Sequence, residues 1–180
     1  MMQSELDVLG DVSARLDALG LPFMLTGSFA LAFYATPRMT RDLDIVVAVD
    51  AGRVAALTEG FSSDYFVDPD VIRSALAAES LFNLMHYGTG LKVDLIVRKS
   101  SAYRMLEFSR RRQVQFGSVH TWIVSREDLI LSKLVWAKES NSEMQLRDVQ
   151  LLIAGPVEVD YLRHWAQELG VGARLEALLP

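Results

Sequence analysis

The stretch from Phe23 to Val49, FMLTGSFALAFYATPRMTRDLDIVVAV, constrains this chain more than any other segment. It places two carboxylates, Asp42 and Asp44, at the start of an apolar, β-branched run that is typical of a buried strand. Because side chains alternate along a strand, these two carboxylates point to the same face. Same-face carboxylates repel each other unless a cation neutralises them, and Mg²⁺ is a hard cation that prefers oxygen ligands.

Two further features favour a site for a metal-bound nucleotide. A third carboxylate, Asp94, lies in a second apolar run, LKVDLIV. The pair Gly27-Ser28 falls between an expected strand and an expected helix. Free backbone N–H groups and the helix dipole at such a junction attract phosphate groups. Arg38 and Arg41, next to the first two carboxylates, are candidates for further phosphate contacts.

Length and composition limit the class of protein. A chain of 180 residues, 51% of them hydrophobic, predicts one compact domain, with or without a helical appendage. The net charge of −5 argues against a generic nucleic-acid coat protein but leaves room for a local basic groove. The absence of cysteine excludes disulfides and thiolate metal sites. The N-terminal segment lacks the basic start of a signal peptide, and no apolar run approaches the roughly 20 residues of a membrane span. We therefore expect a soluble cytoplasmic protein with no membrane partner.

The hydrophobic pattern predicts alternating helices and strands up to residue 124 and helices alone from residue 125. The expected strands are 22–26, 42–49, 81–87, 91–97, 113–116 and 119–124. The expected helices are 3–19, 29–34, 51–59, 71–78, 101–111, 125–140, 142–153, 158–169 and 173–179, and residues 60–70 read as a loop. This order indicates an α/β (α+β) fold: a mixed sheet with flanking helices in residues 1–124, followed by a helical C-terminal region in residues 125–180.

The pair Gly27-Ser28, the helix-length spacer, the Asp42-x-Asp44 motif and the later Asp94 resemble the signature of the nucleotidyltransferase superfamily, which has the DNA polymerase β-like fold. The longer run GSFALAFYATPRMTRDLDIVV is similar to a bacterial branch of that superfamily that includes AbiEii-type toxins of abortive-infection systems. The later segment EDLILSKLVWAKES…LRDVQLL is also similar to that branch. The resemblance covers roughly residues 20–153.

The resemblance implies a role for each carboxylate. Asp42 and Asp44 would hold Mg²⁺, which bridges the triphosphate of a nucleotide. Asp94 would complete a site for two Mg²⁺ ions and help to deprotonate the hydroxyl of the acceptor.

The resemblance also implies the groups that bind the nucleotide. Gly27 would let the backbone approach phosphate, Ser28 would contact a phosphate oxygen, and Lys133 would point from a helix toward the triphosphate as a counter-charge.

Each element also has a plainer interpretation. Asp42 and Asp44 could merely pair with the neighbouring arginines, and Gly27-Ser28 could be an ordinary turn into a helix. Lys133 could be a solvated helix residue, and Arg147-Asp148 favours an exposed or structural ion pair over a catalytic role. The run Arg110-Arg111-Arg112 favours a solvated helix end over a contact with RNA. The three tryptophans lie on apolar stripes that favour the core over base-stacking platforms: Trp122, Trp136 and Trp165.

These features predict a Mg²⁺-dependent nucleotidyltransferase that moves a nucleoside monophosphate from an NTP to a hydroxyl and releases pyrophosphate. The acceptor stays open between RNA such as a tRNA 3′ end, a protein side chain and a small molecule. The resemblance favours a toxin-like role with an antitoxin as partner. The alternatives are a non-catalytic module that binds a nucleotide or a partner, and an antibiotic-type adenylyltransferase.

Overall fold

The computed structural model describes the backbone of residues 2–36 and 42–180, and the side chains of residues 5–36 and 42–180. Arg38 and Arg41 lie outside the described residues. The described strands are β1 (Phe23–Thr26), β2 (Asp42–Val47), β3 (Tyr65–Phe66), β4 (Leu81–His86), β5 (Lys92–Val97), β6 (Arg112–Phe116) and β7 (Val119–Ile123). The described helices are α1 (Met2–Ala18), α2 (Gly27–Tyr34), the 3-10 turn η1 (Ala51–Arg53), α3 (Val54–Phe61), α4 (Pro69–Ala77), α5 (Ala102–Ser109), α6 (Arg126–Ser140), α7 (Glu143–Ile153), α8 (Val159–Glu168) and α9 (Gly172–Glu176).

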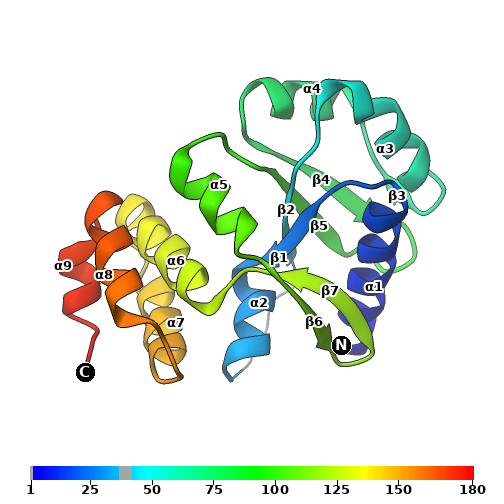
Figure 1. Ribbon diagram of the computed structural model, residues 1–180. Coiled ribbons are helices and arrows are strands. Elements are labelled where there is room, and N and C mark those ends of the chain that lie inside the picture. The colour runs from blue at the N-terminus through cyan, green and yellow to red at the C-terminus, as the bar shows by residue number, and fades with distance from the viewer. Residues whose placement is uncertain (1, 37–41) are drawn as a thin grey trace.

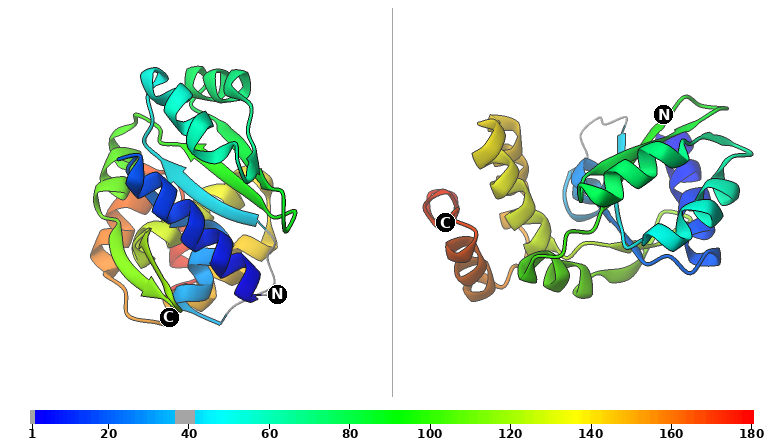
Figure 2. Two further views of the ribbon diagram at one scale, coloured as in Figure 1. Left: turned by 90° about the vertical axis from the view of Figure 1, so that its right-hand side faces the viewer. Right: turned by 90° about the horizontal axis from the view of Figure 1, so that it is seen from above.

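The strands form one mixed sheet in the order β3-β4-β5-β2-β1-β7-β6. β1 runs antiparallel to β2 and parallel to β7, and β2 runs parallel to β5. The helices α6 to α9 gather beside this sheet rather than on top of it (Figures 1 and 2). The mixed α/β fold class expected from the sequence is therefore confirmed, and a helical group follows the last strand.

Most elements fall where the hydrophobic pattern places them, and the differences have local causes. The expected loop 60–70 contains the two-residue strand β3, which pairs antiparallel with β4. α4 begins at Pro69 rather than at Val71, because the side chain of Asp68 caps the helix by accepting from the backbone N–H of Asp70 at 2.8 Å. Proline fits the first turn of a helix, where its missing N–H is not needed.

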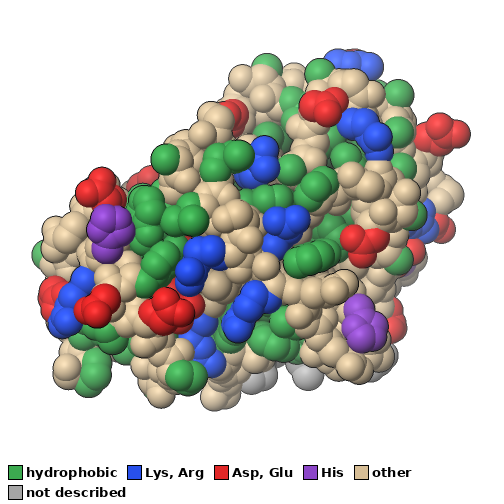
Figure 3. Space-filling view, in the orientation of Figure 1, with side chains coloured by type: hydrophobic (Ala, Val, Ile, Leu, Met, Phe, Trp, Pro, Cys, Tyr) green, Lys and Arg blue, Asp and Glu red, His purple; other side chains and the backbone are tan. Residues whose placement is uncertain are grey.

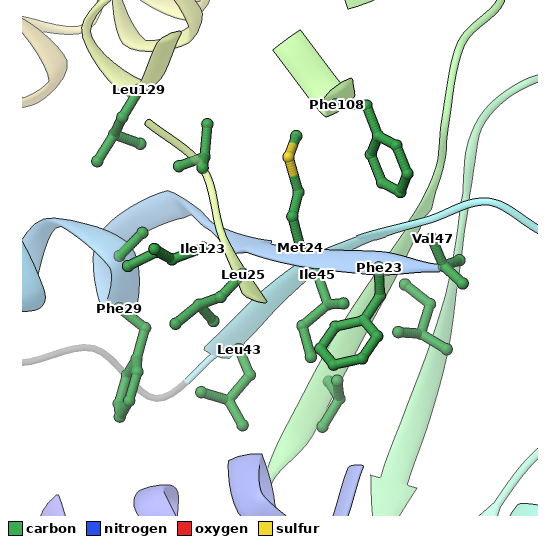
Figure 4. Close-up of a cluster of buried hydrophobic side chains, with 14 of the residues drawn as sticks. Phe23, Met24, Leu25, Phe29, Leu43, Ile45, Val47, Phe108, Ile123 and Leu129 are labelled. Atoms are coloured by element: carbon green, nitrogen blue, oxygen red, sulfur yellow. The ribbon is translucent and has the colours of Figure 1, made fainter. Parts of the chain in front are cut away.

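The core lies on both faces of the sheet. Phe23, Leu25 and Ile45 are fully buried and point toward the face covered by α1, whereas Met24 points to the opposite face, where Phe108 of α5 also lies (Figure 4). Burial of each such side chain stabilises the fold by about 1.5–3 kcal/mol. Side chains thus pack against both faces of β1 and β2, and this packing fixes the position of the start of β2, where Asp42 and Asp44 lie.

One buried carboxylate joins the helical group to the rest of the chain. Asp128 of α6 has no exposed surface, and it accepts hydrogen bonds from Ser125 Oγ at 2.6 Å, Tyr161 Oη at 2.7 Å, Arg110 Nε at 3.1 Å and Tyr103 Oη at 3.2 Å. Tyr103 comes from α5, Arg110 directly follows α5, Tyr161 comes from α8, and Ser125 directly precedes α6. A buried charge needs such a complete set of partners, and the set orients α6 against the sheet domain.

Lys and Arg side chains form a row across the middle of the face shown in Figure 3, over α5, β6 and the start of α6. The sequence pattern favoured a solvated helix end for the run Arg110-Arg111-Arg112. Two of these three arginines instead contact the protein. Arg110 pairs with buried Asp128 and lies 3.9 Å from the ring centre of Tyr161, and Arg111 lies 4.3 Å from that of Phe108. These contacts are cation–π interactions that hold both side chains against the protein.

No helix among the described residues is long and apolar enough to cross a membrane.

Candidate active site

The pairing of β2 with β5 brings the predicted carboxylates together. Asp44 is the direct register partner of Asp94, and Asp42 is that of Lys92. On the other side of β2, Asp44 is the register partner of Thr26, the last residue of β1. Because paired residues on neighbouring strands share a face, the three carboxylates lie on one face at one end of the sheet. Asp42 is exposed, Asp44 is half-buried and Asp94 is buried.

The carboxylates create a strongly negative field. Burial, together with the charges of Asp94 and Asp42, raises the pKa of Asp44 from 3.8 to about 6, while Lys133 and Lys92 act in the opposite direction. A carboxylate with such a raised pKa is one whose charged form lacks compensation. The site therefore favours an added cation.

Two residues that the sequence analysis missed hold Asp94 in place. Lys92 Nζ donates to Asp94 Oδ2 at 3.0 Å and lies 3.8 Å from Asp42 Oδ1, and this contact with Asp94 raises the pKa of Lys92. Asn83 of β4, the register partner of Asp94, donates from Nδ2 to Asp94 Oδ1. A signal for Lys92 was present in the sequence, because it precedes Asp94 by two residues and so shares its face. A protein cation thus bridges two of the three carboxylates.

The three carboxylates offer oxygen ligands for a divalent cation, but their side chains do not surround one common point in this structure. Within the part of the chain that the structure describes, no three Asp, Glu, His or Cys side chains surround one point as a ready-made metal cage. The donor set is nevertheless the kind that Mg²⁺ takes, since Mg²⁺ binds through one or two carboxylates and completes its shell with water and phosphate oxygens. The residues present therefore fit the ion in donor chemistry and in charge.

Gly27 and the carboxylates form a single geometric unit. Gly27 has a φ of +64°, a backbone conformation that glycine adopts without strain. A Cβ built on it would overlap the carboxyl group of Asp44, at 2.7 Å from its Cγ and 2.8 Å from its Cβ. Glycine is thus required here for two reasons. The same residue opens α2, whose first N–H groups have no partner within the helix, and Ser28 is buried directly beside it.

Lys133 is not a solvated helix residue. It is 3% exposed, and its Nζ donates to Asp148 Oδ2 at 2.7 Å and to Gln145 Oε1 at 3.1 Å. Both partners come from α7, so Asp148 belongs to a buried ion pair rather than an exposed one. The charge of Lys133 also lowers the pKa of Asp44, which places the ammonium group within electrostatic reach of the carboxylates.

A cavity of about 710 Å³ connects these groups. Four of the residues expected from the sequence line it, namely Gly27, Asp44, Asp94 and Lys133, while Asp42 and Ser28 are outside the lining. The size is that of a typical ligand pocket. The sheet provides one wall through β1, β2 and β5, and α5 and α6 provide another.

The α5–α6 wall contains a polar cluster that sequence patterns did not indicate. Arg104 Nη1 donates to Glu107 Oε2 at 2.8 Å and to Ser132 Oγ at 2.6 Å, and Ser132 Oγ donates to Glu107 Oε1 at 2.6 Å. Glu107 is buried, and burial raises its pKa while Arg104 opposes the shift. The cluster is internally satisfied and gives this wall a fixed shape.

The three tryptophans differ in burial. Trp122 and Trp165 pack partly buried against the core, as expected. Trp136 does not, since it is 52% exposed and lines the cavity. The apolar stripe of residues 125–140 cannot distinguish a core contact from a cavity wall, which is why the sequence interpretation of Trp136 was wrong.

Comparison with solved structures identifies the architecture. The structure is similar to an antigenic nucleotidyltransferase-like protein from Paracoccidioides brasiliensis, with a TM-score of 0.59 and 18% identity over 98% of this chain and 94% of that chain. The antibiotic-resistance factor ANT(2'')-Ia gives a TM-score of 0.60 and 16% identity over 98% of this chain and 97% of its own. The chain has a nucleotidyltransferase fold.

A third solved structure extends this likeness. The lincosamide antibiotic adenylyltransferase LnuA, in its lincomycin-bound form, gives a TM-score of 0.53 and 13% identity over 83% of this chain and 94% of its own. No protein-family model and no curated protein sequence matches the chain. The nucleotidyltransferase fold is thus shared across nearly the whole length of this chain at low sequence identity, so its activity must be argued from its own residues.

Proposed function

We propose that this protein is a Mg²⁺-dependent nucleotidyltransferase. A hydroxyl oxygen of the acceptor attacks the α-phosphorus of an NTP, the new P–O bond forms, and the bond to the β-phosphate oxygen breaks to release pyrophosphate. The observation that carries the proposal is the meeting of Asp44, Asp94, Gly27 and Lys133 in one cavity of a nucleotidyltransferase fold. Transfer of this kind needs positioning and charge neutralisation more than covalent help from the protein.

Asp42, Asp44 and Asp94 would hold two Mg²⁺ ions in this proposal. When bound, the ions neutralise the triphosphate and stabilise the attacking and leaving oxygens. The negative field that raises the pKa of Asp44 supports this assignment. Lys92 bridges Asp42 and Asp94 in this structure and would have to leave the carboxylates for both to hold the ions.

The other residues bind and orient the reactants. Asp94, positioned by Asn83, accepts the proton of the acceptor hydroxyl. The backbone at Gly27 and the hydroxyl of Ser28 contact phosphate oxygens at the start of α2, where the helix dipole favours negative charge. Lys133, held by Asp148, supplies a fixed positive charge near the triphosphate. Arg38 and Arg41, which lie outside the described residues, would add phosphate contacts.

The two parts of the chain would share the reaction. Residues 1–124 supply the carboxylates, Gly27 and, through α5, part of the far wall of the cavity, and the helical region 125–180 supplies Lys133 and the α6 part of that wall. NTP and Mg²⁺ are cytoplasmic reactants, so we place the enzyme in the cytoplasm.

We favour a small-molecule acceptor. The fold is shared over most of the chain with ANT(2'')-Ia, which has been solved in complex with adenylyl-2''-tobramycin, and with the lincosamide antibiotic adenylyltransferase LnuA, which has been solved with lincomycin bound. The net charge of −5 weakens the case for an RNA acceptor. The second candidate is a toxin of the AbiEii type that acts on tRNA or protein and has an antitoxin partner, and it is supported by the similarity of GSFALAFYATPRMTRDLDIVV to that branch.

The test is transfer of label from α-³²P NTPs, with Mg²⁺, to three acceptor pools: an aminoglycoside and lincosamide panel, total bacterial RNA, and a protein extract. The Asp44→Asn variant runs beside the wild type. We expect the wild type to label the small-molecule pool and the Asp44→Asn variant to label no pool. Label in the RNA or protein pool supports the toxin-like role instead. Nucleotide binding without label in any pool, unaffected by Asp42→Asn, supports the non-catalytic module and contradicts the proposal.

A further inference from the structure

Two exposed hydrophobic side chains lie inside the cavity rather than on the open surface. Trp136 is 52% exposed and Leu81 is 47% exposed, and both line the cavity that contains Asp44 and Asp94. Exposing a tryptophan to water forgoes a large part of its hydrophobic stabilisation. The other large hydrophobic side chains with comparable exposure among the described residues do not line this cavity. The pair therefore indicates a surface that a ligand covers.

Trp136 lies on the same face of α6 as Lys133, and this face lines the cavity. Ser132, Lys133, Trp136 and Glu139 all line it, and their spacing of three and four residues places them on one helical face. At about 1.5 Å per residue, Trp136 lies about 4.5 Å further along the helix axis than Lys133. The indole is therefore roughly one helical turn beyond the ammonium group.

The sheet wall repeats this order. Leu81 of β4 is the register partner of Ile96 of β5, as Asn83 is that of Asp94, so Leu81 and Ile96 share the face of the carboxylate. Ile96 also lines the cavity. At about 3.3 Å per residue, this apolar pair lies about 6.6 Å along the strand from Asp94. On both walls an apolar side chain thus follows the charged group at a similar distance, before charged residues return at Glu139 and Arg98.

A nucleotide has the same order of parts, because its phosphates are separated from a flat, apolar-faced base by one ribose. We propose that Trp136 and Leu81 form the slot that binds the base of the NTP, with Trp136 stacking on the base and Leu81 covering its other face. The proposal rests on the proposed nucleotidyltransferase function and identifies where that reaction binds its base. Stacking on an aromatic ring tolerates every base because each base has a π-face.

The test measures equilibrium binding, not turnover. Each NTP and, separately, inorganic tripolyphosphate is titrated with Mg²⁺ into the wild type and into Trp136→Ala and Trp136→Phe by calorimetry. Met144→Ala is the matched control, since Met144 is 53% exposed on α7 and outside the cavity lining. We expect Trp136→Ala to weaken NTP binding by about 5- to 150-fold, the factor that corresponds to the loss of one base–aromatic stack. Tripolyphosphate binding stays unchanged, and Trp136→Phe retains most of the NTP affinity.

Three results contradict the proposal, and they differ from one another. Trp136→Ala that binds every NTP as tightly as the wild type does overturns the base slot and leaves the proposed function standing. Equal losses of NTP and tripolyphosphate affinity in both Trp136 variants show a general change of the site rather than a lost stack. A wild type that binds no NTP overturns the proposed function itself.

Discussion

Asp44→Asn should stabilise the protein while it abolishes transfer. The folded state raises the pKa of Asp44 from 3.8 to about 6, which means that ionising this side chain costs more in the folded chain than in the unfolded chain. A shift of about 2 pKa units corresponds to about 3 kcal/mol of lost stability at neutral pH. Because Asp44 retains some contact with water, we expect removal of its charge to recover only about 1–2 kcal/mol. For a chain of this size that is a rise in Tm of roughly 3–6 °C.

The pH dependence gives the sign of this effect. Above pH 6 the carboxyl group is ionised in both states, so the full cost is present. As the pH falls through about 6 the folded state binds the proton first and the wild type gains stability, until the unfolded state is also protonated near pH 4. Asp44→Asn lacks this titration. Its advantage over the wild type should therefore be largest at pH 7.5 and close to zero at pH 4.

The assay is urea unfolding of both proteins in EDTA between pH 4 and pH 8. Glu59→Gln is the control, because Glu59 is exposed on α3 and a surface change of this kind should alter stability by less than about 0.5 kcal/mol. Addition of Mg²⁺ should raise the stability of the wild type and leave that of Asp44→Asn almost unchanged. An Asp44→Asn variant that is less stable than the wild type at pH 7.5, or whose advantage does not shrink in acid, would refute the reasoning.

Three further perturbations test separate contacts of the site. Gly27→Ala should lower the free energy of unfolding, measured in urea, by about 1–2 kcal/mol more than Gly20→Ala does. Both glycines have a φ near +60° (+64° and +63°), but a Cβ at Gly27 would overlap the Asp44 carboxyl group, whereas a Cβ at Gly20 meets nothing. Equal losses in the two variants would contradict the clash. Lys92→Ala should lower the Tm of the metal-free protein and enlarge the Tm rise on adding Mg²⁺, since Asp42 and Asp94 lose the ammonium group that bridges them; an unchanged response to Mg²⁺ would show that Lys92 does not compete with the ion for these carboxylates. Asp148→Ala should cost about 3–5 kcal/mol because it removes the carboxylate that is paired with the buried Lys133 ammonium group. The double variant Lys133→Met, Asp148→Leu should have a stability closer to that of the wild type, and a double variant as unstable as Asp148→Ala would contradict this account.

The fold was predictable where the signal is local. Alternation along residues 42–47 and the β-branched run gave β2 and placed Asp42 and Asp44 on one face. β3 was missed because a two-residue edge strand has no periodicity of its own and exists through its pairing with β4. Helix starts moved by one or two residues where a cap decides them, as Asp68 does for α4.

The site was predictable only in part, because its contacts are long-range. No local pattern states that β5 pairs with β2 in the register that sets Asp94 beside Asp44. The position of Asn83 depends on a further strand pairing, and the burial of Asp148 depends on how α7 packs against α6. The exposure of Trp136 could not be predicted for the same reason. Its apolar stripe is visible in the sequence, but the cavity that it lines is formed by tertiary packing.

The most direct test of the central claim is Mn²⁺ binding at pH 7.5, measured by the loss of the free-ion signal in electron paramagnetic resonance. Mn²⁺ takes the same oxygen ligands as Mg²⁺ and is visible in this experiment. The account predicts that the wild type binds Mn²⁺ more tightly when ATP is present, and that Asp44→Asn weakens binding by at least about tenfold, the equivalent of about 1.4 kcal/mol. Equal Mn²⁺ binding by the two proteins, with or without ATP, would contradict the assignment of the carboxylates as the metal–nucleotide site.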